Sequence, residues 1–270
     1  MEGKSRLAIN PIGKMKKFEL SFVQEALDRL VASGFTGILV GGHAVNFWAL
    51  LYGHPTPEWS ELLPYTSEDV DFLGGRPEAL MCKKLFGGVS NLNDGTDPSP
   101  QAGVILARLN RTTIRFDIIT SIIGIDSREV GKKALTPPGQ DPAASLRVLH
   151  PLHCLIGKTA ALAQIPQAGR QDLKHLKLSI LIVHAFLTER LGEVRPLLNN
   201  IDHIFDVARE EIGLRVWHRH GVEIEKALPL EGIAAQSDER LQKFASTRLP
   251  QLVAQLKEMR QRYLDSLSES

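Results

Sequence analysis

The chain has 270 residues, of which 43% are hydrophobic and 23% are charged, and its formal net charge is +1 at pH 7. This length can bury a sizeable core and lies between one large domain and two. The near-neutral charge gives no indication of nucleic-acid binding, and no apolar run is long enough to predict a membrane span.

The cysteines and the start of the chain predict a cytoplasmic protein. Cys82 and Cys154 have no paired spacing, which fits reduced thiols better than a disulfide framework. The polar first segment carries Lys14, Lys16 and Lys17 and lacks the apolar centre of a signal peptide. We therefore expect a cytoplasmic location and no membrane partner.

In chain order, the first half alternates helical and strand patterns. Ile38-Leu39-Val40 reads as a buried strand that leads through Gly41-Gly42 into a helix near His43. The other predicted elements are a helix over 18–33, a strand over 69–73, a helix over 77–85, a polar loop over 91–101, and strands over 104–109 and 113–119. Asn110-Arg111 is predicted to join the last two strands as a hairpin.

The second half is predicted to be helical. A stretch rich in Pro and Gly at 136–142 marks the expected boundary between domains 1–145 and 146–270. A short strand is predicted over 146–149. It is followed by predicted helices over 151–164, 170–191, 194–212 and 238–266.

Three acids on predicted strands are the main candidates for a functional site. Side chains at i and i+2 of a strand share a face, so Asp69 and Asp71 project together while Val70 and Phe72 face the core. Asp117 lies in an alternating, β-branched segment predicted to be a neighbouring strand. Carboxylates this close raise one another's pKa, and a hard divalent cation such as Mg²⁺ relieves the repulsion. An isolated Asp-x-Asp is also common in surface turns.

Gly41-Gly42 is a candidate phosphate cradle, because glycines permit close approach and the N–H groups at a helix start attract anions. An ordinary tight strand-to-helix turn has the same pattern. Lys158, in an otherwise apolar segment, either extends to the surface or points at a phosphate. A local positive cluster could meet a triphosphate or an RNA backbone, or form a solvated helix face; it comprises Arg170, Lys174, His175 and Lys177.

In order and context, Gly41-Gly42, Asp69-x-Asp71 and Asp117 resemble the nucleotidyltransferases of the DNA polymerase β-like superfamily, in particular small bacterial predicted members and the toxin-like AbiEii type. The resemblance covers roughly residues 20 to 120, and more loosely the helical remainder, in which Lys158 and Asp172 look like the family's lysine and aspartate. It implies an α+β fold, with a nucleotidyltransferase-type mixed β-sheet flanked by helices and then an all-helical C-terminal domain.

The sequence departs from the family pattern just before the paired acids, where the segment 51–65 is also longer than compact members need. An arginine often precedes the paired acids in that family. Here Tyr65 stands at its place, while Ser67 keeps the hydroxyl. One triphosphate contact of the family is therefore missing at this point of the chain.

The resemblance implies a nucleotidyltransferase. Asp69, Asp71 and Asp117 would hold two Mg²⁺ ions, and Asp117 would help activate an acceptor hydroxyl for attack on the α-phosphorus of a nucleoside triphosphate. The triphosphate would be bound by Gly41, Gly42, Ser67 and Lys158.

The acceptor stays open among a tRNA end, a protein side chain and a small molecule. Two alternatives also stay open. One is a catalytically silent relative that binds a nucleotide or a protein partner, as in a toxin–antitoxin pair. The other is a metal-dependent phosphohydrolase.

Overall fold

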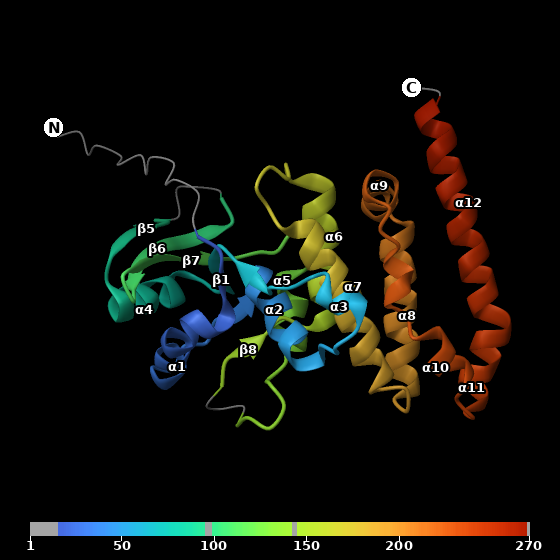
Figure 1. Cartoon of the computed structure of the whole chain (residues 1–270), viewed down its shortest axis with the longest axis horizontal. Helices are drawn as coiled ribbons and strands as arrows, with labels where there is room; N and C mark the ends of the chain where they lie inside the picture. The colour runs from blue at the N-terminus through green and yellow to red at the C-terminus, as the bar shows by residue number, and fades with distance from the viewer. Residues whose placement is uncertain (1–15, 95–98, 142–144, 269–270) are drawn as a thin grey trace.

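The computed structural model describes residues 16–94, 99–141 and 145–268. The fold is mixed α+β, with a mixed sheet flanked by helices and a helical stretch toward the C-terminus (Figure 1). The strands are β1 (Phe18–Glu19), β2 (Ile38–Val40), β3 (Thr66–Ser67), β4 (Asp69–Leu73), β5 (Val89–Leu92), β6 (Gln101–Leu109), β7 (Thr112–Ile119) and β8 (Arg147–Val148).

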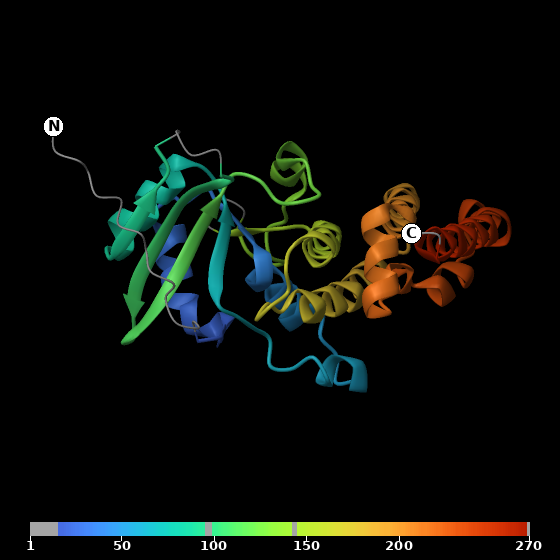
Figure 2. The same ribbon diagram turned by 90° about the horizontal axis from the view of Figure 1, so that it is seen from above.

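The helices lie between the strands and over the whole second half. The α-helices are α1 (Gln24–Ala32), α2 (Gly41–Tyr52), α3 (Pro57–Ser60), α4 (Arg76–Phe86), α5 (Ser127–Lys133), α6 (Pro151–Gln164), α7 (Asp172–Thr188), α8 (Val194–Arg209), α9 (Glu211–His220), α10 (Leu230–Ala234), α11 (Glu239–Lys243) and α12 (Leu249–Ser268). Two 3-10 segments, η1 (Leu20–Val23) and η3 (Ile224–Ala227), and a π-helical segment, η4 (Phe244–Arg248), complete the set. The sheet lies at one end of the molecule, and α8, α9 and α12 lie at the other (Figure 2).

The six-stranded sheet has the order β5-β6-β7-β4-β2-β8. Strand β4 runs antiparallel to β2 and parallel to β7. In this register Asp71 lies opposite Val40 on one side and Asp117 on the other. The two acid-bearing strands are therefore direct neighbours, as the sequence predicts.

Strand alternation separates the acids from the core. Val70, Phe72 and Phe116 are fully buried. Phe72 meets Phe35 edge-on at 4.9 Å, and Phe116 stacks on Phe86 of α4 at 4.8 Å between ring centroids. Because successive side chains point to opposite faces, Asp69, Asp71 and Asp117 lie on the face away from this aromatic packing.

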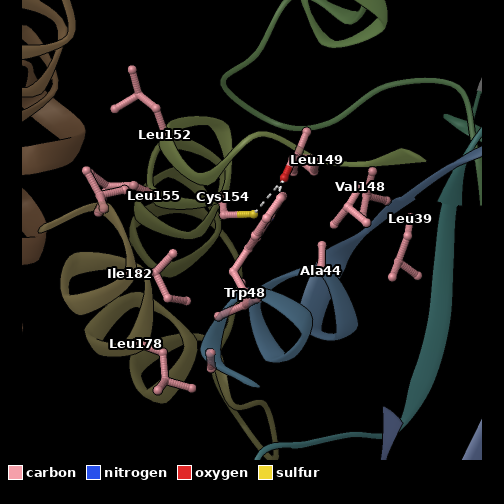
Figure 3. Close-up of a cluster of buried hydrophobic side chains, with 14 of the residues drawn as sticks. Leu39, Ala44, Trp48, Val148, Leu149, Leu152, Cys154, Leu155, Leu178 and Ile182 are labelled. Carbon is pink, nitrogen blue, oxygen red and sulfur yellow. Dashed lines mark hydrogen bonds between the residues drawn. The ribbon is translucent and has the colours of Figure 1, made fainter. Parts of the chain in front are cut away.

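Helix α2 connects the sheet to the helical stretch through a shared core. Trp48 of α2 is buried between the two parts and donates its Nε1–H to the carbonyl of Leu149 at 2.7 Å (Figure 3). Leu155 of α6 and Leu178 and Ile182 of α7 lie around it (Figure 3). These residues belong to one continuous hydrophobic cluster, so the start of α7 is held close to the acid-bearing face.

The hairpin between β6 and β7 is confirmed. Asn110 and Arg111 have φ values of 46° and 64°, and Leu109 pairs with Thr112. A two-residue turn with positive φ at both positions matches the twist of the flanking strands, and Asn tolerates this conformation better than most residues.

Several predicted boundaries differ from the structure. The helix predicted over 18–33 starts only at Gln24, because Phe18 pairs with Ser67 as a strand residue and is buried. The strand predicted over 146–149 forms β8 and pairs with β2, so the sheet is completed after the expected boundary at 145. Part of the loop predicted over 91–101 is strand, since β5 ends at Leu92 and β6 begins at Gln101.

The helix predicted over 194–212 is two helices. Glu210 is extended, with ψ of 157°, and separates α8 from α9. At Gly213 a Cβ would overlap the carbonyl oxygen of Val207, so the close packing of α9 on the end of α8 needs a glycine there. Within the residues described, no helix combines the length and the apolar character needed to cross a membrane.

Candidate metal centre

The three predicted acids converge. Asp69 and Asp71 come from β4 and Asp117 comes from β7, and each offers a carboxylate oxygen within 4.8 Å of the others. Across the described part of the chain, no other group of three or more His, Cys, Asp or Glu side chains is placed to share an ion. The triad could therefore bind a metal ion.

The fold does not compensate the charge of Asp71. Burial raises the pKa of Asp71 well above its usual value, and the charges of Asp69 and Asp117 raise it further, against the opposing effects of Lys158 and Arg115. No described residue donates a hydrogen bond to its carboxylate. A partly buried carboxylate of this kind is stabilised by a bound cation, which would supply the missing positive charge.

Asp117 has one protein partner. Arg115, two residues earlier on the same strand and therefore on the same face, donates its Nε–H to Oδ1 at 2.8 Å. Burial raises the pKa of Asp117, and the hydrogen bond and charge of Arg115 only partly oppose that rise. The Asp117 carboxylate is thus oriented while its proton affinity stays above the usual range.

The glycine turn packs directly against the acids. Gly41 has a φ of 64°, and a Cβ there would overlap Oδ2 of Asp71. A Cβ at Gly42 would lie 2.5 Å from Oγ of Ser67 and 2.8 Å from Cε1 of His175. Both glycines are required by close approach, and the start of α2 forms part of the wall of the site.

A pocket of about 280 Å³ opens above the triad. Its other lining residues come from the strand region, from α2 and α6, and from the start of α7 and the residues just before it: Gly42, Ser67, Glu68, Arg115, Lys158, Gly169, Arg170, Gln171, Asp172 and His175. Five of all the lining side chains are carboxylates and three are Lys or Arg. Full ionisation therefore leaves the pocket with two uncompensated negative charges.

The helical side of the pocket contains a compensated acid. Asp172 accepts from Nζ of Lys158 at 2.9 Å and from Nε of Arg170 at 2.5 Å, and its side chain is only 2% exposed. Burial acts to raise the pKa of Asp172, but the two cations outweigh it and lower that pKa to about 2. The Lys158 ammonium group is therefore paired with Asp172 at the wall of the pocket.

The predicted positive cluster divides into two groups. Arg170 and His175 line the pocket. Lys174 instead donates to the carbonyl of Pro64 at 2.5 Å, and Lys177 is exposed. Sequence reasoning missed Glu68, Arg115 and Gln171 as pocket residues. Arg115 could have been predicted, because a residue two positions before Asp117 on a strand shares its face. No sequence pattern indicated Gln171.

No protein-family model, no curated protein and no solved structure matches this chain. We therefore interpret the pocket from its own geometry and charge.

Proposed function

We propose that the chain is a magnesium-dependent nucleotidyltransferase, which moves a nucleoside monophosphate from a nucleoside triphosphate to an acceptor hydroxyl and releases pyrophosphate. The observation that carries the proposal is the convergence of Asp69, Asp71 and Asp117, on neighbouring parallel strands, below a pocket walled by the Gly41-Gly42 turn. The order of these features along the chain is that of the DNA polymerase β-like nucleotidyltransferases, which supports the same assignment.

The residues present fit Mg²⁺. The triad offers only carboxylate oxygens, which hard cations prefer, and magnesium commonly shares one or two such groups with substrate phosphates. Asp71 is partly buried and has no hydrogen-bond donor among the described residues, and the pocket retains two negative charges. We assign two ions to the triad; when bound, they would stabilise the charge that develops on the phosphate oxygens.

The triphosphate would lie toward the helical side. The Ser67 hydroxyl and the first N–H groups of α2 can donate to phosphate oxygens, since a helix start favours anions. Lys158 and Arg170 bring positive charge to the same pocket. Arg170 thereby supplies a guanidinium that compensates for Tyr65, which stands where the family often has its arginine.

Asp117 is the proposed base. Arg115 holds its Oδ1, so Oδ2 is left to accept the proton of the acceptor hydroxyl. The acceptor proton would pass to this second carboxylate oxygen. The deprotonated oxygen then attacks the α-phosphorus in line with the departing pyrophosphate, and the tight pocket holds the two reactants in that geometry.

A labelling experiment tests the proposal. The purified protein is incubated with Mg²⁺, each of the four α-labelled nucleoside triphosphates and a cell extract, and labelled RNA, protein and small molecules are separated. We expect transfer to one acceptor class. Asp71→Asn should slow transfer by at least about 100-fold, because the central metal ligand is lost, while Asp202→Asn on the exposed side of α8 should not change it.

Transfer at the original rate by Asp71→Asn would disprove the assignment. Free labelled monophosphate without a labelled acceptor would indicate a phosphohydrolase instead. Binding of a triphosphate without any turnover would indicate a catalytically silent relative.

A further inference from the structure

Three side chains at the start of α7 bind the backbone that leads into the acid-bearing strand. Nε2 of Gln171 lies 3.0 Å from the carbonyl oxygen of Thr66, and Nε2 of His175 lies 3.2 Å from the same oxygen. Nζ of Lys174 donates to the carbonyl of Pro64 at 2.5 Å. These contacts join positions 105 to 110 residues apart in the chain.

The tautomer of His175 follows from this geometry. His175 is buried, and burial, aided by the charge of Lys158, lowers its pKa to about 3, so the ring is neutral near pH 7. A carbonyl oxygen can only accept, so the single ring proton lies on Nε2. Gln171 and His175 therefore both donate to Thr66, and together they use the two lone pairs of its carbonyl oxygen.

Little else fixes this part of the backbone. Thr66 and Ser67 form β3, which lies outside the six-stranded sheet and pairs only with the two residues of β1. A single residue, Glu68, separates β3 from β4. The Thr66 carbonyl oxygen itself is held by the side chains of Gln171 and His175.

A displacement of Thr66 would reach the metal centre through tight contacts. The Ser67 hydroxyl donates to Oδ1 of Asp69 at 3.3 Å. Gly42 lies so close to Ser67 and His175 that a methyl group at position 42 would collide with both side chains. The segment cannot move toward the turn, and the hydrogen bonds from Gln171 and His175 oppose its movement away from it.

We propose that Gln171 and His175 are positioning residues whose N–H groups, by holding the Thr66 carbonyl, place Asp69 within reach of Asp71 and Asp117. The helical stretch then completes the metal centre without contacting the ion. This inference rests on the metal binding in the proposed function, but not on nucleotide transfer.

The test compares variants of the full chain that differ in one donor. His175→Leu removes the ring N–H, whereas His175→Gln keeps an N–H near the place of Nε2. Gln171→Leu removes the second donor. Because Gln171 is less buried than His175, this variant still tests the inference if His175→Leu does not fold. Lys177→Met, on the exposed face of α7, is the control.

Two measurements are made on each variant. Amide hydrogen exchange over residues 65–71 reports whether the strand is held. Mn²⁺ affinity, from the electron paramagnetic resonance signal of the free ion, reports whether the acids stay in place. We expect faster exchange and an affinity about tenfold weaker in His175→Leu and Gln171→Leu, since partners that orient metal ligands typically matter by this factor. His175→Gln should recover most of both, and Lys177→Met should match the original protein.

Unchanged exchange or unchanged Mn²⁺ affinity in both leucine variants would overturn the inference. So would a His175→Gln variant as impaired as His175→Leu, since packing and not hydrogen bonding would then be responsible. If the original protein binds no Mn²⁺, the proposed function fails and the positioning of a metal centre fails with it. If Mn²⁺ binds and the variants behave as expected but no nucleotide is transferred, the inference stands without the proposed reaction.

Discussion

Two aspartates, Asp172, which is buried, and Asp71, which is partly buried, face the same pocket from opposite sides. Asp172, at the start of α7, binds Lys158 and Arg170, and its pKa is lowered to about 2. Asp71, on β4, receives no hydrogen bond from any residue that the structure describes, and its pKa is raised well above the usual value. The helical side of the pocket is therefore electrostatically complete, whereas the sheet side is not.

This difference distinguishes a carboxylate whose charge is neutralised within the fold from one whose charge is left for a ligand to neutralise. A buried carboxylate that the fold pairs contributes to stability, because its partners offset the cost of removing it from water. A carboxylate that loses part of its contact with water and is left unpaired costs stability, and it is retained where a ligand supplies the missing charge. Asp172 and Asp71 illustrate the two cases within one pocket, so the same substitution should affect them in opposite directions.

The largest expected effect tests this opposition directly. Asp172→Asn should lower the free energy of unfolding by about 3 kcal/mol, because it leaves the charge of Lys158, whose side chain is only 13% exposed, without its counter-ion. Asp71→Asn should leave that free energy unchanged or raise it by about 1 kcal/mol, because it relieves repulsion among the acids. Urea unfolding at pH 7 in the presence of a chelator measures both. Equal destabilisation by the two variants would contradict the comparison.

The pH dependence of the unfolding free energy should show the same contrast between Asp172 and Asp71. The pKa of Asp172 is about 2 in the folded chain against about 3.8 when unperturbed, so folding favours its ionised form. The stabilisation is present above pH 4 and is lost as the pH falls toward 2, and it amounts to about 2 kcal/mol. Unfolding free energies at pH 5 and pH 2 should therefore differ less in Asp172→Asn than in the original protein.

Asp71 should show the opposite slope. Its raised pKa means that folding favours the protonated form, so stability falls as the pH rises above the unperturbed value of 3.8. Asp71→Asn removes this opposing contribution.

The Asp172 prediction has its own contrary outcome. If Asp172→Asn loses as much stability on acidification as the original protein, the ion pairs of Asp172 are not the source of the acid sensitivity.

The smallest expected effect distinguishes the two partners of Asp172. The side chain of Arg170 is 44% exposed, so water screens its ion pair and Arg170→Met should cost less than about 1 kcal/mol. Lys158→Met should cost more, because it removes the buried partner. Thermal unfolding of the two methionine variants at equal ionic strength gives the ranking. The reverse order would mean that Arg170 is the main counter-ion.

Local periodicity was enough to predict the sheet side of the site. The alternation in 69–73 and 113–119 places the acids on one face and Val70 and Phe116 in the core, and the structure has this arrangement. Val70 and Phe116 also pair across β4 and β7, so the same alternation brings Asp71 opposite Asp117. A pattern of period two carries this information within each strand.

The helical side could not be predicted in the same way. The contacts of Gln171 and His175 with Thr66 span more than 100 residues, and no local pattern encodes them. The break at Glu210 is likewise a packing effect, since it depends on how Gly213 meets the end of α8. Arg115, on β7, was also missed, although its spacing of two residues from Asp117 places it on the acid face.

The long separation between Thr66 and α7 also sets an order of events during protein synthesis. All three acids have been polymerised by residue 117, before Lys158, Gln171 and His175 exist in the chain. At typical translation rates of roughly 5 to 20 residues per second, about 5 to 20 s pass between the appearance of Thr66 and that of its partners on α7. The nascent sheet must therefore tolerate its own acidic face for that interval, and the pocket takes its final form only when the second half of the chain arrives.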